Sequence, residues 1–325
     1  RPASCRAARP CRARPELKTG ADAVTSRLLW ASGYNVPEDY VVYFRPEDLV
    51  LAPDAVVKSE GGSTKGRLDP ATLARQLAVL DHTRDGQIRS LASRWIAGTN
   101  LGGTADEGVR DDDPNDRIPH QLRRDLRGAY AILEWVDNVD LQIGNAIDVL
   151  VTDPAGTRHV KHYRLDFDGS LGAMAALNHA LRIGYENLFD WSNMLVDTST
   201  LGLAGRPWLD RRAPALRGVS PGFTAAGFDP GGWKPDIPVA AFDDADRFDM
   251  FWGAKIVARF TPEQIRAAVE AGRYSDPRAV DYLTRTLIAR QRAIVAYWFS
   301  RVSPLDHVTA SPSGIGVENC WKASL

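Results

Sequence analysis

The chain has 325 residues, of which 44% are hydrophobic and 25% are charged, a globular composition with enough apolar residues for a sizeable core. Its 40 basic and 41 acidic residues leave a formal net charge of -1, so overall charge does not direct it to nucleic acid or to an anionic membrane. The three cysteines lack the paired spacing of a zinc site, and their odd number argues against a disulfide framework. No run approaches the roughly 18 apolar residues of a membrane span, so we expect a soluble chain.

The first segment, residues 1–18, is rich in arginine and proline and is expected to be a disordered basic tail. A basic arm that binds nucleic acid or a membrane is the alternative, and we favour the solvated tail. The chain begins at arginine instead of methionine, so we expect further sequence upstream and leave the cellular compartment open.

Residues 19–98 predict a small part that is rich in strands. Val24, Leu28 and Leu29 fall at helical spacing and indicate a helix of about four turns. Gly33 follows them and is expected to end this helix. Strands are expected at 40–44, 48–51 and 90–97, with an exposed glycine-rich turn at 61–66.

Residues 99–310 predict a larger and mainly helical part. Apolar residues from Ile118 to Val136 lie on one stripe at helical spacing, which predicts a single amphipathic helix. A polar loop follows this helix. The later elements expected are strands at 146–151 and 159–167, helices beginning at Thr261-Pro and at Ser275-Asp-Pro, and a tail over 311–325.

The residues with catalytic potential concentrate between the predicted helix and the end of the predicted hairpin. Asp140 and Asn145 lie five residues apart in the loop, and Asp166 ends the second strand 21 residues later. Phosphoryl transfer needs a carboxylate near the incoming nucleophile and hard oxygen ligands that hold magnesium against the phosphates. The order of helix, polar loop, hairpin and terminal aspartate is that of the catalytic core of protein kinases. Turn-forming and capping roles are the alternatives for these three residues.

More specifically, the chain resembles an uncharacterised bacterial group related to the HipA and CotH kinase-like families. The resemblance runs from about Thr19 to Ser300. Its carriers are the segments 26–37, 92–98, 112–116, 140–145, 162–167, 201–203, 207–208 and 275–277. It implies an α+β, two-lobed protein-kinase-like fold, with an incomplete small β-rich N-lobe ending in a hinge at residue 98 and a mainly helical C-lobe over 99–310. Related full-length proteins often look exported.

The same resemblance implies ATP and Mg²⁺ as cofactors and a role for each site residue. Asp140 is then the catalytic carboxylate, and Asn145 and Asp166 are the magnesium ligands. The hinge that binds the adenine corresponds to Ser93, Arg94, Trp95 and Ile96. Asp22 is the acid of the first helix that such kinases pair with a strand lysine.

Three departures from the family pattern bear on activity. The chain lacks a glycine-rich phosphate loop and a strand lysine ahead of Asp22, and Lys18 lies too close to serve. Gln142 stands where these families usually carry a basic residue. The magnesium element reads Asp166-Phe-Asp-Gly169, in which Asp168 either adds a ligand or extends the turn, and we favour the turn.

Three other candidate sites have simpler structural readings. The acidic run Asp111–Asp113 with Asp116 lacks the pattern of a calcium loop and is expected to be a solvated helix start. His159 and His162 lie three apart on a strand, so they are expected on opposite faces. Tryptophans at 208, 233 and 252 are expected to be buried packing, with a carbohydrate or peptide platform as the alternative.

Two functions therefore follow from the sequence. The first is an ATP- and magnesium-dependent phosphotransferase that binds a nucleotide and transfers phosphate to a hydroxyl of a protein or small molecule, without a nucleic-acid partner. The second is a catalytically inactive pseudokinase that serves as a binding or envelope-associated scaffold. A metal-dependent hydrolase built on the same aspartates is a third and weaker option.

Overall fold

The computed structural model describes residues 16–58, 63–80, 82–178, 180–206, 208 and 212–323, and shows a mixed α+β fold with small antiparallel sheets. Residues 1–15 of the predicted tail and part of the glycine-rich turn lie outside these residues. The tail predicted over 1–18 is wrong at its end, because Leu17 and Lys18 begin α1 and Leu17 is buried in the core. The described helices are α1 (Leu17–Ala31), α2 (Pro70–Ala78), α3 (Arg124–Arg127), α4 (Ala129–Val136), α5 (Ala173–Leu177), α6 (Trp191–Thr200), α7 (Ala240–Asp243), α8 (Arg247–Ala258), α9 (Pro262–Glu270), α10 (Pro277–Phe299) and α11 (Cys320–Ala323). Short 3-10 helices are η1 (Pro46–Asp48), η2 (His120–Leu122) and η3 (Ile143–Asn145).

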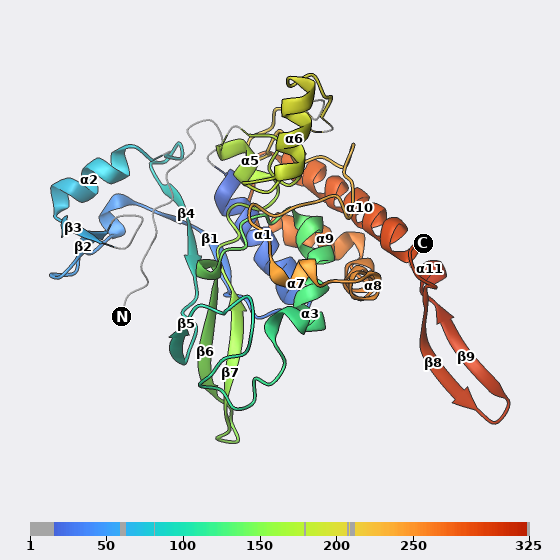
Figure 1. Cartoon of the computed structure of the whole chain (residues 1–325). Helices are drawn as coiled ribbons and strands as arrows, with labels where there is room; N and C mark the ends of the chain where they lie inside the picture. Colours follow the sequence, from blue (N-terminus) through green and yellow to red (C-terminus); the bar gives the residue numbers. More distant parts are fainter. Residues whose placement is uncertain are drawn as a thin grey trace.

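The strands pair in small antiparallel sheets (Figure 1). β1 (Asp39–Phe44) pairs with β4 (Ile88–Ser93), and β2 (Val56–Lys58) pairs with β3 (Thr64–Arg67). A three-stranded sheet has the order β5 (Thr99–Gly102), β6 (Ala146–Thr152), β7 (Arg158–Arg164). β8 (Leu305–Ser311) and β9 (Gly314–Asn319) form a hairpin that projects away from the helices. The tail predicted over 311–325 is therefore wrong for 314–323, because β9 pairs with β8 and α11 follows it.

The core lies among α1, α4, α8, α9 and α10, whose buried side chains form one cluster in the described part of the chain. Every residue of α4 is buried, because α8 and α10 pack against it. The Trp135 indole N–H donates to the Leu287 carbonyl oxygen at 2.8 Å, which ties α4 to α10. None of the described helices is both long enough and apolar enough to cross a membrane.

The two helices predicted from their start signals are confirmed. Thr261 caps α9 with a complete capping box. The Thr261 hydroxyl accepts the Gln264 N–H, and the Gln264 side-chain oxygen accepts the Thr261 N–H. Asp276 caps α10, and Pro277 takes the first helical position, where a missing N–H costs nothing. The predicted strands around the turn at 153–156 are also found, as β6 and β7.

The single helix predicted from Ile118 to Val136 is wrong. The segment is divided into η2, α3 and α4, and both Ile118 and Leu122 are exposed. The break between α3 and α4 lies at Gly128, where α8 comes so close that a Cβ on Gly253 would be 2.1 Å from the Gly128 carbonyl oxygen. Helix α8 therefore packs closely against the start of α4.

Two smaller predictions are also wrong. Residues 48–51 do not form a strand, because Asp48 ends η1 and its carboxylate accepts the Arg45 N–H at 2.7 Å. The acidic run 111–116 does not start a helix, and Asp116 is buried with hydrogen bonds from the Arg110 N–H and the His120 ring.

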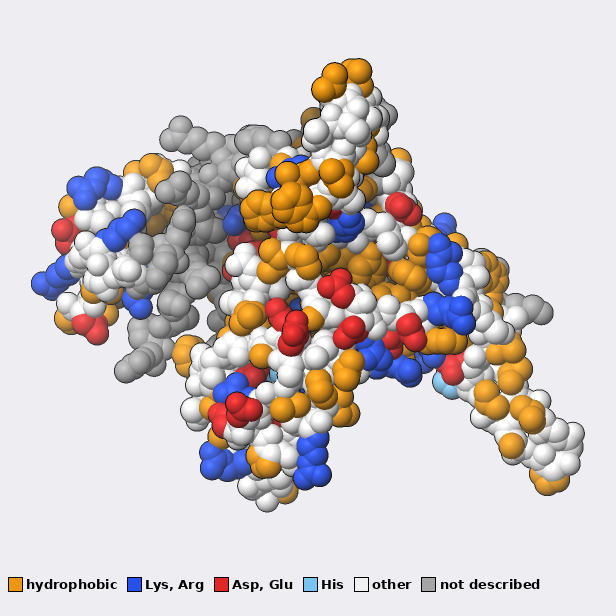
Figure 2. Space-filling model, viewed as in Figure 1, with side chains coloured by type: hydrophobic (Ala, Val, Ile, Leu, Met, Phe, Trp, Pro, Cys, Tyr) orange, Lys and Arg blue, Asp and Glu red, His pale blue; other side chains and the backbone are white. Residues whose placement is uncertain are grey.

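Hydrophobic side chains are exposed over α6, at the top of the view in Figure 2. Trp191 is 72% exposed and Leu195 is 70% exposed, and no residue of α6 is buried. This helix therefore contributes little to the core. Its first turn is held by Asp190, which accepts the Asn193 N–H and pairs with Lys234.

Candidate functional site

The loop after α4 is closed by its own side chains. Asp137 ends α4 in the left-handed conformation with φ +53°, which turns the chain out of the helix. The Asn145 side-chain amide donates to the Asp140 carbonyl oxygen at 3.1 Å. The Gln142 amide donates to the Asp140 carboxylate at 2.8 Å. Asp140 is therefore held in place by two other residues of the same loop.

The hairpin β6–β7 brings Asp166 back to this loop, as the sequence predicted. The Leu165 N–H donates to the Asn145 carbonyl oxygen at 2.8 Å, directly before Asp166. Asp166 has φ +62°, an unusual conformation for a non-glycine residue and one that is frequent at functional sites. A Cβ placed on Gly169 would lie 4.0 Å from the Asp140 Cβ. The three predicted residues thus come together at one end of the hairpin.

Helix α1 holds the Asp-Phe-Asp-Gly element by two contacts. The Asp22 carboxylate accepts the Phe167 N–H at 2.9 Å, and the Phe167 ring is fully buried. Lys18, one helical turn before Asp22, forms an ion pair with Asp168 at 2.7 Å. Asp22 therefore contacts the backbone of this element. The cation on this side of α1 is Lys18, which belongs to the same helix as Asp22 and not to a strand.

Asp22 also faces a second buried carboxyl, that of Asp39 at the start of β1. Burial, followed by the charge of Asp39, raises the pKa of Asp22 well above its ordinary value. Burial also raises the pKa of Asp39, against opposing hydrogen bonds from Ser93 and Asp22. Burial and the neighbouring carboxylate thus favour the protonated form of Asp22.

The four residues predicted as the hinge, Ser93 to Ile96, differ in their contacts and in their exposure. Ser93 ends β4 and contacts Asp39, so it adjoins the buried carboxyl pair. The Arg94 N–H donates to the Glu38 carbonyl oxygen at 2.9 Å, and its guanidinium pairs with the Glu38 carboxylate. Trp95 is 69% exposed and Ile96 is half-buried.

Asp236 is an acidic neighbour of the site that sequence reasoning missed. Its N–H donates to the Val139 carbonyl oxygen at 3.0 Å, one residue before Asp140. Burial and then the charge of Asp140 raise the pKa of Asp236. No motif marks this residue, because almost 100 residues of chain separate it from its neighbour.

The oxygen atoms of the loop suit a hard cation. The Asn145 amide nitrogen donates to the Asp140 carbonyl oxygen, so the Asn145 Oδ1 remains as a candidate ligand atom. The Leu165 N–H, directly before Asp166, donates to the Asn145 backbone oxygen. Magnesium prefers such oxygen atoms and usually keeps waters or phosphate oxygens in its other positions. Among the residues that the structure describes, no group of three or more His, Cys, Asp or Glu side chains is arranged to hold a metal. Asn145 and Asp166 are two side chains of this segment with oxygen atoms that magnesium prefers.

A second polar cluster braces the far part of the same hairpin. Asp148 is buried, and the His162 ring and the Thr104 hydroxyl each lie 2.6 Å from its Oδ1. Burial raises its pKa, but these two hydrogen bonds and Arg110 outweigh burial and lower the pKa of Asp148 to about 2. His162 faces Asp148 across the strands whereas His159 faces Val151, so the cluster makes no histidine pair for a metal.

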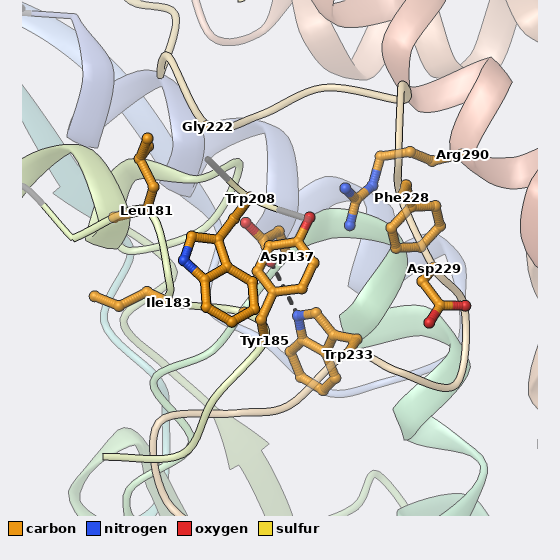
Figure 3. A pocket seen from close by; sticks show the side chains of 12 residues that line it. Asp137, Leu181, Ile183, Tyr185, Trp208, Gly222, Phe228, Asp229, Trp233 and Arg290 are labelled. Carbon is orange, nitrogen blue, oxygen red and sulfur yellow. Dashed lines mark hydrogen bonds between the residues drawn. The ribbon is translucent and has the colours of Figure 1, made fainter. Parts of the chain in front are cut away.

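A small pocket, with room for about one water molecule, lies beside the loop (Figure 3). Asp137 is at its centre, and the Trp233 indole N–H donates to the Asp137 carboxylate at 2.9 Å. Trp233 is buried, as expected for packing, while Tyr185 and Trp208 lie in front of Asp137 with their rings 5.2 Å apart. Arg290 approaches from α10 on the other side.

No protein-family model, curated protein or solved structure matches this chain. The features of this chain that bear on its function are the arrangement of Asp140, Asn145 and Asp166 and the pocket next to them. Both lie at the end of α4, on the side where the hairpin meets α1.

Proposed function

We propose that this protein is an ATP- and magnesium-dependent phosphotransferase of the protein-kinase-like superfamily that acts on a hydroxyl acceptor. The observation that supports it is the meeting of Asp140, Asn145 and the segment 166–169 at one end of the β6–β7 hairpin. These residues supply a carboxylate and oxygen ligands, which are the groups that phosphoryl transfer requires.

We also propose the two-lobed arrangement of that superfamily for this chain. In it, α1 with the β1–β4 pair is the reduced N-lobe, and the helices from α4 onward are the C-lobe. The order of α4, polar loop, hairpin and Asp166 supports this assignment. The segment Ser93–Ile96 is then the part that contacts the adenine, and Ser93 connects it to Asp22 through Asp39.

In this proposal Asp140 orients the acceptor hydroxyl and receives its proton. The hydroxyl oxygen forms a new bond to the γ-phosphorus, the bond from that phosphorus to the β,γ-bridging oxygen breaks, and ADP leaves. Asn145 and Asp166 would hold magnesium, which supplies positive charge against the phosphate oxygens. Lys18 lies beside Asp168 and adds a cation on the same side.

Nucleotide binding tests the proposal directly. ATP with magnesium is expected to raise the melting temperature of the native chain, and neither ligand alone should do so fully. Asp166→Asn is expected to abolish the rise, because it removes a charged ligand. Asp153→Asn, in the distant β6–β7 turn, is the matched control and should keep it. An equal rise in Asp166→Asn would place the nucleotide elsewhere and overturn the assignment.

Turnover provides the second test. Asp140→Asn keeps the size of the side chain and should retain nucleotide binding. The rate of ADP formation is expected to fall by about 10²- to 10⁴-fold, which is the usual contribution of a positioned proton acceptor. A turnover rate equal to that of the native chain would remove Asp140 from the catalytic role.

Two contacts favour the pseudokinase scaffold as a second candidate. Gln142 donates to the Asp140 carboxylate, and Lys18 neutralises Asp168. The first contact occupies the carboxylate that an active site would use as a proton acceptor, and the second offsets the charge of the acid that lies two residues after Asp166. The absence of any melting shift at saturating ATP and magnesium would favour this scaffold over the enzyme, whereas phosphate release without an acceptor would indicate a hydrolase.

A further inference from the structure

The chain between β5 and η2, residues 103–119, lies against the start of the β6–β7 hairpin. A Cβ placed on Gly103 would be 3.1 Å from the Ile143 carbonyl oxygen, so this glycine lets the chain touch η3. The hydroxyl of the next residue, Thr104, donates to the Asp148 carboxylate of β6 at 2.6 Å. The segment 103–119 therefore borders the candidate catalytic loop, which ends with η3.

The side chain of His120, at the start of η2, holds the two ends of this segment together. Its ring is buried. The ring Nδ1 lies 2.6 Å from the Ala105 carbonyl oxygen, and the ring Nε2 lies 2.8 Å from the Asp116 carboxylate. The His120 backbone N–H also donates to the Gly108 carbonyl oxygen at 2.7 Å. One imidazole ring thus joins the beginning of the segment 103–119 to its end.

Both ring nitrogens of His120 face oxygen atoms that can only accept a hydrogen bond. The Ala105 carbonyl oxygen has no proton to donate, and an ionised Asp116 has none either. Burial would raise the pKa of Asp116, but the hydrogen bonds from the Arg110 N–H and from His120 outweigh burial and lower that pKa. A neutral imidazole has one N–H, whereas the charged ring has two. Only the doubly protonated ring can therefore make both hydrogen bonds.

Charged and titratable side chains from the same stretch of chain and from the hairpin surround this ring. They are Asp106, Arg110, Asp116 and Arg123, and across from them Asp148 and His162. The two acids Asp106 and Asp116 favour a charged His120, whereas the arginines and a protonated His162 oppose it. The rings of His120 and His162 meet edge to face, with their centroids 5.6 Å apart. The bond from His162 to Asp148 needs only one ring proton, so a neutral His162 keeps it. The bonds of His120, by contrast, depend on a second proton.

We propose that His120 is a pH-sensitive switch, which holds the segment 103–119 against η3 when its ring carries two protons and loosens the segment when it carries one. Loss of one proton leaves either the Ala105 carbonyl oxygen or the Asp116 carboxylate without the His120 donor, and a buried polar atom is costly to leave unpaired. Because the closed form holds the extra proton, a rising pH favours the loosened form. The switch does not rest on the proposed phosphotransferase function, since it involves neither a nucleotide nor a metal.

Protonation of the ring is tested by nuclear magnetic resonance of the histidine nitrogens in the full chain. The titration runs from pH 5 to pH 9, a range that includes the ordinary charge change of histidine. The His120 signals are assigned by their loss in His120→Gln. Both nitrogens of this ring are expected to carry a proton at the acid end of the range, and one of them at the alkaline end. A ring that keeps the same number of protons over the whole range would overturn the proposal.

Closure of the segment is tested by amide hydrogen exchange in the native chain. The reporter is the Arg110 N–H, because it donates to the Asp116 carboxylate at 2.7 Å within the closed segment. After correction for the pH dependence of the exchange chemistry, its protection should fall about tenfold from pH 5.5 to pH 8.5, as expected for one lost buried hydrogen bond. Equal protection at the two pH values would overturn the proposal.

Variants separate the His120 proton from other titrating groups. His120→Gln has no ring proton to lose, so the fall in protection with pH should disappear. Asp116→Asn supplies an amide that can donate to the unprotonated nitrogen, so a neutral ring keeps both bonds and the fall should shrink to less than about twofold. This second variant provides the same test if His120→Gln does not fold. His159→Gln, on β7 and facing Val151, is the control and should keep the full fall. A full fall in either folded variant would assign the pH dependence to another group and overturn the proposal.

Discussion

Glu134→Gln is expected to remove a pH-dependent part of the free energy of unfolding. Glu134 lies on α4 with no exposed surface, and its carboxyl accepts the Trp298 indole N–H at 2.8 Å and the Gly231 N–H at 3.1 Å. Burial raises the pKa of Glu134 to about 8, although the two hydrogen bonds and the nearby Arg290 oppose this rise. The folded protein therefore carries a proton here at neutral pH.

The size of the effect follows from proton linkage. Between its ordinary pKa of 4.5 and about 8, the folded state holds the Glu134 proton and the unfolded state does not. The contribution of Glu134 to the free energy of unfolding is then largest below pH 4.5 and falls by about 1.4 kcal/mol for each pH unit between pH 4.5 and about 8. The contribution of this one side chain should thus decline by about 5 kcal/mol up to pH 8.

Urea unfolding of the native chain and of Glu134→Gln, at intervals from pH 5 to pH 9, measures this decline as the difference in free energy of unfolding between the two proteins. Glutamine has no proton to lose, so the difference in free energy between the two proteins should change with pH by about 1.4 kcal/mol per unit. The loss of one hydrogen bond in the variant adds a constant offset of about 1–3 kcal/mol. A difference that stays constant over pH 5–8 would mean that Glu134 is ionised in the fold, and would refute the reasoning.

Three further predictions concern stability and are measured by urea unfolding. Asp148→Asn should lower the free energy of unfolding by about 2 kcal/mol at neutral pH, because the pKa of Asp148 is lowered to about 2 in the fold. The stabilisation by the Asp148 carboxylate is present above pH 3.8, so the difference between the native chain and the variant should shrink as the pH falls towards 2. Gly253→Ala should cost about 2 kcal/mol or more, because the new Cβ would lie 2.1 Å from a backbone oxygen, whereas Gly144→Ala, in open space, should change stability by less than about 0.5 kcal/mol. Thr261→Ala should cost about 1 kcal/mol through the lost cap of α9, and no loss would show that Gln264 suffices to start this helix.

Local signals in the sequence predicted the elements whose ends are set by neighbouring residues. Thr261 and Gln264 mark the start of α9, Pro277 opens α10, and the turn at 153–156 joins β6 to β7. Each of these signals acts over four or fewer residues. The closeness of Asn145 to the backbone before Asp166 was predictable for a similar reason. A hairpin of two consecutive strands lies between them and returns the chain to the point where it began.

The helix predicted over 118–136 failed because its apolar stripe does not face a single neighbour. Ile118 and Leu122 are exposed, while α4 is buried on all sides by α8 and α10. The extended backbone of Arg123 divides η2 from α3, and Gly253 of α8 packs against Gly128 where α4 begins. Hydrophobic spacing alone gives no sign of such a contact.

The sequence by itself determined the helix caps and the β6–β7 hairpin that follows the polar loop after α4, because short-range hydrogen bonds and turn geometry fix them. The tertiary structure alone decided which charges meet. It placed Lys18 on Asp168 and Asp22 against Asp39, and it joined Trp233 to Asp137 across 96 residues. These contacts depend on the packing of α1 and of the loop near Trp233 around α4, and packing between distant segments leaves no periodic pattern in the chain.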